Sequence, residues 1–210
     1  MARMTGPKCR LCRREGMKLF LKGERCHTIK CAVDRRGTPP GIHTWSRRRR
    51  STYGEQLREK QRLKRIYGVM ERQFRTYFAS AVKRRGNTGA NLVLEVERRL
   101  DNVVRAAGIG HGPNSARQIV GHGHVFVNGH RCDRPSRQVK AGDVITITKK
   151  EKARKHVAAI ADATKAYNPT PPEWLDVNRE TLEIRVLQLP TREQFPYPIN
   201  ENLIVEGCSK

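Results

Sequence analysis

The sequence predicts an α+β protein. It should contain an N-terminal zinc knuckle, a mainly helical domain, and a small α/β module of helices and a β-hairpin before a C-terminal extended segment. Three observations support this prediction. Four cysteines near the N-terminus form two close pairs. Apolar residues recur at helical spacing through residues 55–107, and residues 114–148 combine a short helix with a hairpin pattern.

The module at residues 114–148 gives the clearest local signals. Asn114 or Ser115 is the expected helix N-cap, because a short side-chain oxygen accepts an otherwise unpaired amide proton there. The glycines at 121 and 123 should end that helix. Asn128-Gly129 favours a two-residue hairpin turn, because both positions tolerate a positive φ. Strands are expected at residues 124–127, 130–132 and 144–148, and the last of these is β-branched throughout.

The helical part of the chain is recognised by its composition and its period. Strong helix formers and apolar residues at i, i+4 and i+7 predict helices at residues 55–66, 70–82, 93–107 and 149–166. Phe74, Tyr77 and Phe78 share the apolar face of the second helix. They are therefore expected in a core, although stacking on bases is the alternative. Prolines follow the last helix, and strands or extended arms are expected at residues 182–187 and 203–205.

Net charge is the strongest indication of a partner. The chain has 43 Lys and Arg residues against 20 Asp and Glu residues, a formal net charge of +23. Residues 1–100 carry +19 of this charge, whereas residues 151–210 carry −1. Such an excess is costly through self-repulsion unless a polyanion neutralises it. Nucleic acid is therefore the expected partner, with a footprint mainly on the first half and on the module.

Several classes of protein are disfavoured. No apolar run approaches the roughly 20 residues of a membrane-spanning helix, and no signal-peptide pattern is visible at the N-terminus. The carboxylates are scattered, and the common nucleophile, zinc-protease and phosphate-loop motifs are absent from the sequence. Catalysis is therefore not expected, and neither is a membrane partner.

The cysteines give the most specific chemical motif. Cys9, Cys12, Cys26 and Cys31 are spaced as C-x2-C-x13-C-x4-C. Each pair can supply two thiolates from one tight turn, which suits a tetrahedral, structural Zn²⁺. The segment has few large apolar residues, so a metal would supply stability that a core cannot. Two disulfides or four unrelated thiols are the alternatives, and His27 could replace Cys26. Cys132 and Cys208 are expected to be packed or idle thiols.

Two further clusters have a polar interpretation. The run Arg47 to Arg50 follows a proline-rich linker and lies between Trp45 and Tyr53. A run of like charge is usually a solvated surface, but in this basic half phosphate contact is favoured. Histidines at positions 122, 124 and 130 could suggest a metal site or a general base. Within a basic module, hydrogen bonding to phosphate or simple surface exposure is the expected role.

Several long stretches then resemble one known family. They cover nearly the whole chain in the family's order and read GPKCRLCRREG at 6–16, YGEQLREKQRLKRIYGVMERQFRTYF at 53–78, GNTGANL at 86–92, RLDNVVRAAGI at 99–109, HGHVFVNG at 122–129, PSRQVKAGDVI at 135–145 and INENLIVE at 199–206. Together they resemble small-subunit ribosomal protein four. The four-cysteine knuckle is similar to the zinc-bearing branch of that family.

The resemblance implies a structural rather than an enzymatic role. It implies a protein of the cytoplasmic ribosome that binds 16S rRNA in the 5′ domain and nucleates assembly of the subunit body. It also implies contact with small-subunit ribosomal protein five, linked to translational accuracy, and proximity to mRNA where it enters the subunit. A stand-alone RNA-binding regulator and an RNA-modifying enzyme are the other hypotheses. High-salt co-sedimentation with mature subunits and an assay for RNA modification separate these three.

The expected organisation has four parts. These are a knuckle and basic linker at 1–45, a helical domain at 46–97, the small RNA-binding module at 98–165, and a C-terminal segment at 166–210 that packs back on the helical domain. A-form RNA is read mainly through phosphates and 2′-hydroxyls, so basic and amide side chains should make the contacts. The RNA-binding residues expected are Arg3, Lys8, Arg10, Arg13, Arg14, Arg35, Arg36, Arg47, Arg48, Arg49, Arg50, Tyr53, Gln56, Arg58, Lys60, Gln61, Lys64, Arg65, Arg72, Lys83, Arg84, Arg85, Arg117, His122, Asn128, Arg131 and Arg134.

Overall fold

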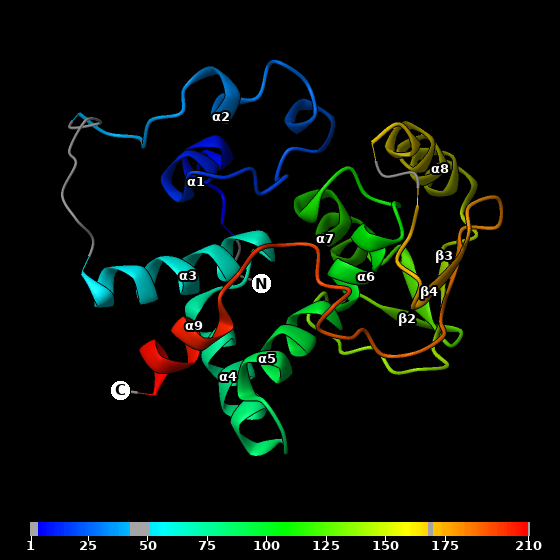
Figure 1. The fold of residues 1–210 in the computed structure, drawn as a ribbon. Coiled ribbons are helices and arrows are strands. Elements are labelled where there is room, and N and C mark those ends of the chain that lie inside the picture. The colour runs from blue at the N-terminus through cyan, green and yellow to red at the C-terminus, as the bar shows by residue number, and fades with distance from the viewer. Residues whose placement is uncertain (1–3, 43–50, 168–169, 210) are drawn as a thin grey trace. The chain divides into compact units, whose positions relative to one another are not determined.

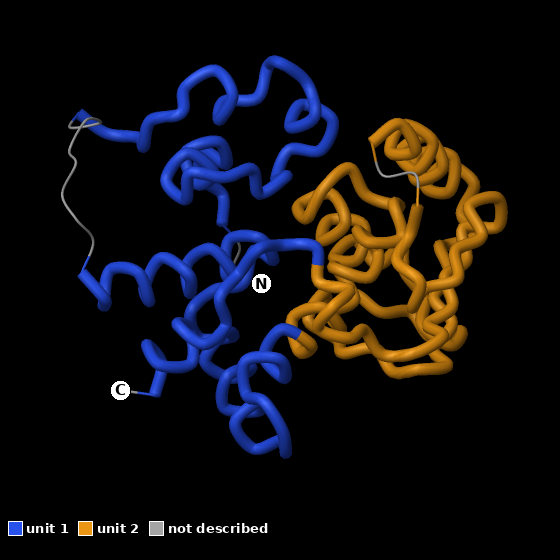
Figure 2. The backbone as a smooth tube through the Cα atoms, in the orientation of Figure 1, with its two compact units in different colours: residues 1–93, 196–210 blue, residues 94–195 orange. Residues whose placement is uncertain are grey.

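A computed structural model describes residues 4–42, 51–167 and 170–209 of the chain. It divides into two compact units, shown in different colours in Figure 2. Unit 1 comprises residues 1–93 and 196–210, and unit 2 comprises residues 94–195. Helices dominate unit 1, and a small antiparallel sheet with helices makes up unit 2. The α+β class predicted from the sequence is therefore confirmed.

Unit 1 is built from short N-terminal elements followed by longer helices (Figure 1). Ser51 caps α3, because its hydroxyl accepts a hydrogen bond from the Gly54 amide at 3.2 Å. Asn87 caps α5 in the same way through the amides of Gly89 and Ala90. The elements are α1 (Lys8–Glu15), η1 (Gly23–Cys26), α2 (Ala32–Arg35), α3 (Thr52–Ile66), α4 (Glu71–Lys83), α5 (Thr88–Glu97) and α9 (Glu201–Cys208).

The apolar faces predicted from periodicity form the interior of unit 1. Leu63 and Ile66 of α3 are fully buried, and so is Phe74 of α4. Tyr77 retains only 5% of its exposure, so these two aromatic rings are core residues and not stacking platforms. Burial of such rings contributes a large share of the apolar area that stabilises a unit of this size. The core interpretation of Phe74 and Tyr77 is thus confirmed.

The C-terminal residues 203–205 are helical, which corrects the expectation of a strand or extended arm. They belong to α9, which Asn200 caps through the amides of Asn202 and Leu203. Helix α9 packs against α3. Gly207 makes this close approach possible, because a Cβ there would lie 3.0 Å from the Gln56 side chain. A short apolar run does not distinguish strand from helix by itself, and packing against α3 decides it.

In its described residues, unit 2 combines four helices, counting the last turn of α5, with a five-stranded antiparallel sheet in the order β2-β1-β3-β5-β4. One apolar cluster joins the sheet to α6, α7 and α8, and Trp174 is its largest buried side chain. The elements are α6 (Leu100–Ala106), α7 (Pro113–Gly121), β1 (Val125–Val127), β2 (His130–Cys132), β3 (Val144–Ile147), α8 (Glu151–Lys165), β4 (Leu175–Asn178) and β5 (Glu183–Val186).

The hairpin of β1 and β2 matches the sequence prediction. Val127 faces His130 across a turn in which Asn128 has φ 52° and Gly129 has φ 79°. These two positive φ values are those that an Asn-Gly turn of this kind requires. The predicted strands at residues 144–148 and 182–187 are also present as β3 and β5.

The helix expected at residues 93–107 is instead two helices, α5 and α6, separated at Arg98 and Arg99. The chain bends there because its backbone pairs with residues 137–139. The Leu100 amide donates to the Arg137 carbonyl, and the Val139 amide donates to the Arg98 carbonyl, both at 2.9 Å. Arg99 is 1% exposed and donates two hydrogen bonds to Asp101, at 2.9 and 2.5 Å. No local signal marks this break, because the pairing partner is distant in sequence.

Two other expectations differ from the structure. Helix α7 begins earlier than predicted, with Gly112 as its N-cap and Pro113 at its first position. Neither Asn114 nor Ser115 is the cap, since proline is pre-organised for the first turn. The small module was expected to end at residue 165, whereas unit 2 continues to 195. The sequence analysis did not predict strand β4. This strand pairs with β5, and β5 pairs with β3, so both strands extend the sheet. No described helix is long and apolar enough to cross a membrane.

The buried pair of Arg99 and Asp101 yields a stability prediction. Asp101→Asn should lower the free energy of unfolding by about 3 kcal/mol, because the buried guanidinium then faces an amide in place of a carboxylate. Urea unfolding followed by circular dichroism measures the change. Glu183→Gln breaks the exposed pair of Glu183 with Arg185 and is the matched control, expected to cost about 0.5 kcal/mol. Equal losses in the two variants would contradict the prediction.

Candidate nucleic-acid interface

The predicted RNA-binding residues separate into those held by internal contacts and those on the surface. Arg3 and the run Arg47 to Arg50 lie outside the described residues. The remaining residues can be sorted by burial and by hydrogen-bond partner. Burial matters because a phosphate can only approach a cation that solvent reaches.

Glu15 holds two of the predicted residues in unit 1. Its side chain is fully buried at the end of α1, and its Oε1 accepts hydrogen bonds from Arg58 and Arg65 of α3. Both guanidinium groups are mostly covered, with 20% and 16% of their side-chain area exposed. A buried carboxylate needs such partners to offset the loss of its hydration. These two arginines therefore join α1 to α3 and are poorly placed for a phosphate.

Glu71, at the start of α4, holds two predicted lysines. Its carboxylate accepts from Lys60 at 2.7 Å, from Lys64 at 2.6 Å and from Arg75 at 3.2 Å. Partial burial raises the pKa of Glu71, but the hydrogen bonds from these three cations outweigh it and lower the pKa to about 2. Lys64 itself is 8% exposed. The carboxylate thus stays ionised and fixes α4 against α3.

Several other predicted residues also have structural roles. Gln56 is 3% exposed and donates to Glu206 of α9 at 3.2 Å. Arg13 donates to the Thr38 carbonyl at 2.9 Å. Arg117 lies 3.6 Å from the buried carboxylate of Asp101.

Asn128 is exposed, but its amide group is engaged inside unit 2. Its Oδ1 accepts from the Val144 amide at 2.8 Å, and its Nδ2 donates to Asp143 at 2.9 Å. This residue therefore orders the hairpin turn and offers RNA little beyond its backbone.

The exposed members form the candidate interface. In unit 1 the solvent-exposed predicted residues include an aromatic ring, Tyr53, with 69% exposure. Lys8 and Gln61 are half-buried, and Lys8 donates to the Met4 carbonyl. The exposed set comprises Arg10, Arg14, Arg35, Arg36, Tyr53, Arg72, Lys83, Arg84 and Arg85 in unit 1, and His122, Arg131 and Arg134 in unit 2.

One face of α4 presents part of this set in a shallow hollow of about 610 Å³. Arg72, Arg75 and Lys83 line it together with the small residues Thr76, Ala79 and Ser80. The spacing of these residues places them on one side of the helix, opposite the buried Phe74 and Tyr77. Small residues between cations leave room for a phosphate backbone to approach closely.

In unit 2 the candidate interface lies where α7 meets β1. Gly123 has φ 72°, and the Arg131 guanidinium lies where a Cβ of residue 123 would be, within 2.6 Å of that position. The rings of His122 and His124 are 5.9 Å apart in an edge-to-face arrangement. Burial lowers the pKa of His124, and His122, Arg131, His156 and Lys150 lower it further.

The sequence-based list omitted three of these residues, namely His124, Lys150 and His156. The His-x-His spacing at 122 and 124 was visible in the sequence, although its metal and phosphate interpretations remained open. The position of Lys150 and His156 near His124 depends on how β3 leads into α8. Only the tertiary structure places these side chains together.

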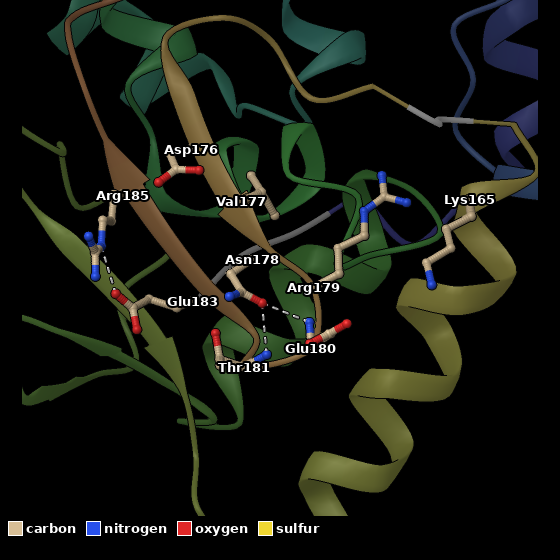
Figure 3. Close-up of a pocket in the computed structure, with 9 residues that line it drawn as sticks. All are labelled: Lys165, Asp176, Val177, Asn178, Arg179, Glu180, Thr181, Glu183 and Arg185. Carbon is tan, nitrogen blue, oxygen red and sulfur yellow. Dashed lines mark hydrogen bonds and ion pairs between the residues drawn. The ribbon is translucent and has the colours of Figure 1, made fainter.

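A hollow of about 860 Å³ at the β4–β5 hairpin has a different character (Figure 3). Asn178 orders its turn by accepting from the Glu180 and Thr181 amides at 3.0 and 3.1 Å. Arg185 is paired with Glu183 at 2.8 Å. Its lining is of mixed sign, so its acidic groups weaken attraction for a polyanion. It is lined by Lys165, Asp176, Val177, Asn178, Arg179, Glu180, Thr181, Glu183 and Arg185.

The four N-terminal cysteines line one small cavity in unit 1. Cys12, Cys26 and Cys31 are buried, and Cys9 is half-buried. The Lys22 amide donates to the Cys26 sulfur at 3.4 Å. Burial raises the pKa of the Cys12 and Cys26 thiols, and the neighbouring cysteines raise it further, while backbone hydrogen bonds oppose the rise. All six cysteines are unpaired thiols, so the alternative of two disulfides is not realised in this structure.

These thiols fit a structural metal in their chemistry, because all four are soft sulfur donors that line one cavity, and the Cys26 sulfur accepts a hydrogen bond from a backbone amide. Side chains in the described part of the chain do not form a group of three or more in metal-binding geometry. Cys132 is buried within unit 2, and Cys208 is half-buried in α9.

A basic helical unit and a second unit with a helix-and-hairpin module, both exposing cations, define a nucleic-acid-binding protein. Comparison with known families makes this specific. Residues 3–97 match the ribosomal protein S4/S9 N-terminal domain, and residues 98–145 match the S4 domain. The chain therefore belongs to the ribosomal protein S4 family.

Individual relatives are similar to this chain over their full length. The chain is 55% identical over 210 residues to small ribosomal subunit protein uS4A of Clostridium botulinum, with all of both chains covered. It is 50% identical to small ribosomal subunit protein uS4 of Halothermothrix orenii and 52% identical to that of Clostridium tetani, again with complete coverage. These names describe a ribosomal protein and not an enzyme, as the absence of catalytic motifs had indicated.

The Glu71 network gives a pH-dependent prediction. Because the pKa of Glu71 is lowered from 4.5 to about 2 on folding, its contribution to stability is present above about pH 4.5. That contribution is lost as the pH falls from about 4.5 towards 2. Glu71→Gln should lower the free energy of unfolding by about 1 kcal/mol at neutral pH, since its 38% exposure leaves it screened by solvent.

The measurement is urea unfolding of the parent chain and the variant at about pH 7, 4 and 2.5. The difference between the two proteins should shrink as the pH falls. Glu24→Gln, at an exposed position of η1, is the matched control and should behave like the parent at each pH. A difference that stays constant down to about pH 2.5 would count against the role of Glu71.

Proposed function

We propose that this protein is a structural constituent of the small ribosomal subunit in the cytoplasmic ribosome, where it binds 16S rRNA. The observation that carries the proposal is the complete-length similarity, at 50–55% identity, to proteins named small ribosomal subunit protein uS4. The net charge of +23 and the exposed cations of both units support it independently. A polyanionic partner stabilises such a chain, because its carboxylates are too few to neutralise its positive charge.

The mechanism is architectural binding through phosphates. The major groove of A-form RNA is too deep and narrow for side chains to read its bases, so phosphates and 2′-hydroxyls supply most contacts. Arginine suits this role because its planar guanidinium can donate two parallel hydrogen bonds to one phosphate. Arg10 and Arg14 of α1, the cations of α4, and Arg131 and Arg134 of unit 2 are exposed for this purpose. Each neutralised phosphate releases counterions, which makes the affinity sensitive to salt.

The resemblance of the sequence to the family suggests where on the subunit the protein binds and which partners it contacts. We propose that the RNA site lies in the 5′ domain of 16S rRNA and that binding there nucleates assembly of the subunit body. We also propose contact with small-subunit ribosomal protein five, which contributes to translational accuracy, and proximity to mRNA where it enters the subunit. Co-sedimentation with mature subunits at high salt is the expected result, whereas a stand-alone regulator would dissociate.

We further propose that Cys9, Cys12, Cys26 and Cys31 hold a structural Zn²⁺. The convergence of their side chains on one cavity and the Lys22 amide bonded to the Cys26 sulfur support this. A closed set of four thiolates leaves no position for substrate, so the ion would supply folding stability only. That stability matters because few large apolar side chains are buried in this segment, Leu19 and Leu21 among them.

An RNA-binding prediction separates exposed from internal cations. The double variant Arg131→Ala and Arg134→Ala should weaken binding to a 16S rRNA 5′-domain transcript about tenfold at moderate salt. The slope of log affinity against log salt should fall by about 1.5, because two phosphate contacts are lost. Filter binding at several salt concentrations gives both quantities.

The matched control is Arg185→Ala, an exposed arginine of the same unit that is paired with Glu183 in the mixed-charge hollow. It should leave both affinity and slope within about twofold of the parent. An equal effect of the two variants would show that the contribution is nonspecific charge, and the assignment of the interface would then be wrong.

The zinc proposal predicts one metal ion per chain. Cys12→Ser should lower the zinc content from about one equivalent to near zero, because three thiolates hold the ion far less tightly. Mass-spectrometric metal analysis of the purified chain measures it, and a chelator should increase proteolysis within residues 4–42. Cys208→Ser is the control and should keep the ion. A parent chain without stoichiometric metal, whose N-terminal segment resists a chelator, would overturn the proposal.

A further inference from the structure

A group of basic and imidazole side chains gathers in unit 2 around His124, and three elements contribute to it. His122 and His124 follow the end of α7, and Arg131 comes from β2. Lys150 is the N-cap of α8, and His156 lies in the second turn of that helix. We call this group the His124 cluster, and its members are His122, His124, Arg131, Lys150 and His156.

The backbone holds the cluster in place. The His122 amide donates to the Gln118 carbonyl at 2.9 Å, and the His124 amide donates to the Ile119 carbonyl at 3.2 Å. The Thr148 amide then donates to the His124 carbonyl at 2.8 Å. Because Thr148 is buried and lies two residues before Lys150, this bond fixes the start of α8 beside His124. Arg131 lies against Gly123, where any larger residue would displace its guanidinium.

The cluster is accessible and strongly basic. His122, Arg131, Lys150 and His156 are exposed, and His124 is half-buried between them. Burial is the largest cause of the lowered pKa of His124, and the four other members of the cluster supply the electrostatic causes. The nearest acidic residue along α8, Glu151, is paired with Lys155 at 2.6 Å. The local field therefore disfavours a proton on His124 until an anion arrives.

A metal is not the ligand that these residues suit. Arginine and lysine beside the histidines are donors to anions and cannot ligate a cation. The combination of a guanidinium, an ammonium group and imidazoles matches a phosphodiester, whose oxygens accept several hydrogen bonds. The match to the S4 domain ends at residue 145, so Lys150 and His156 lie beyond it.

We propose that the His124 cluster binds an RNA phosphate and that His124 takes up a proton as the phosphate binds. This inference rests on the proposed function, because it requires RNA as the partner. It adds the first turns of α8 to the binding surface of unit 2. It also makes RNA binding by this protein dependent on pH.

The direction of the effect follows from linkage. In the free protein, burial and neighbouring cations keep the pKa of His124 below its ordinary value of 6.5. A bound phosphate cancels part of that repulsion and accepts a hydrogen bond from the imidazolium, so the pKa rises in the complex. The complex then binds more protons than the free protein does, and affinity increases as the pH falls. One proton taken up fully corresponds to about tenfold per pH unit, and partial uptake to less.

The test measures affinity for a 16S rRNA 5′-domain transcript between about pH 8 and pH 5.5 at constant ionic strength. The full-length parent should bind about tenfold more tightly at about pH 5.5 than at about pH 7.5. His124→Gln should bind with less than about threefold change over the same range. His130→Gln, an exposed histidine of β2 outside the cluster, is the matched control and should keep the parent's pH dependence. Protonation of the RNA itself is common to all variants and cancels in the comparison.

A second variant protects the test against misfolding of His124→Gln. His156 is exposed on α8, so His156→Gln should leave the circular dichroism spectrum unchanged and weaken RNA binding. Nuclear magnetic resonance titration of the His124 ring should show its midpoint moving upward on RNA binding. The inference is overturned if His124→Gln folds and keeps the full pH dependence, or if the ring midpoint does not move. Absence of RNA binding at every pH in low salt would instead overturn the proposed function.

Discussion

The scarcity of carboxylates is the constraint that organises this protein. Three acidic side chains each hold two or three cations inside a unit. Glu15 binds Arg58 and Arg65, Glu71 binds Lys60, Lys64 and Arg75, and Asp101 binds Arg99 with Arg117 near by. Glu15 joins α1 to α3 and Glu71 joins α4 to α3, whereas Asp101 pairs with the neighbouring Arg99 and lies 3.6 Å from Arg117 of α7. The predicted cations that stay exposed, such as Arg10, Arg72 and Arg131, form the surface available to RNA.

This division explains which of the predicted RNA-binding residues are exposed in the structure and which are held inside a unit. Composition shows that the chain is basic, but it does not show which cations are neutralised within the fold. Arg58 and Arg65 lie far along the chain from Glu15, and Asn128 lies 15 residues from Asp143. Such partners are brought together only by packing. Conversely, Lys150 and His156 join His124 because β3 pairs with β1 and leads directly into α8.

Local chemistry predicted many of the helices and strands, but it missed β4, assigned residues 203–205 to the wrong kind of element and misplaced several boundaries. The Asn-Gly turn between β1 and β2 and the apolar faces of α3 and α4 follow from short-range rules, and they are present as expected. The break between α5 and α6 at Arg98 and Arg99 does not follow from short-range rules, because it depends on backbone pairing with residues 137–139. The helical state of residues 203–205 likewise reflects the packing of α9 on α3. In α7, Gly112 is the N-cap in place of the predicted Asn114 or Ser115, because the helix begins at Pro113.

The sequence by itself determined the α+β class, the family and the basic character of the chain. Each of these depends on composition or on residues close in the chain. Tertiary structure alone decided that strands β4 and β5 extend the sheet, that Glu15, Glu71 and Asp101 withdraw particular cations from the surface, and that histidines from α7 and α8 meet around His124. The physical reason is that burial and hydrogen bonding between distant segments are fixed by packing, which periodicity and spacing do not encode.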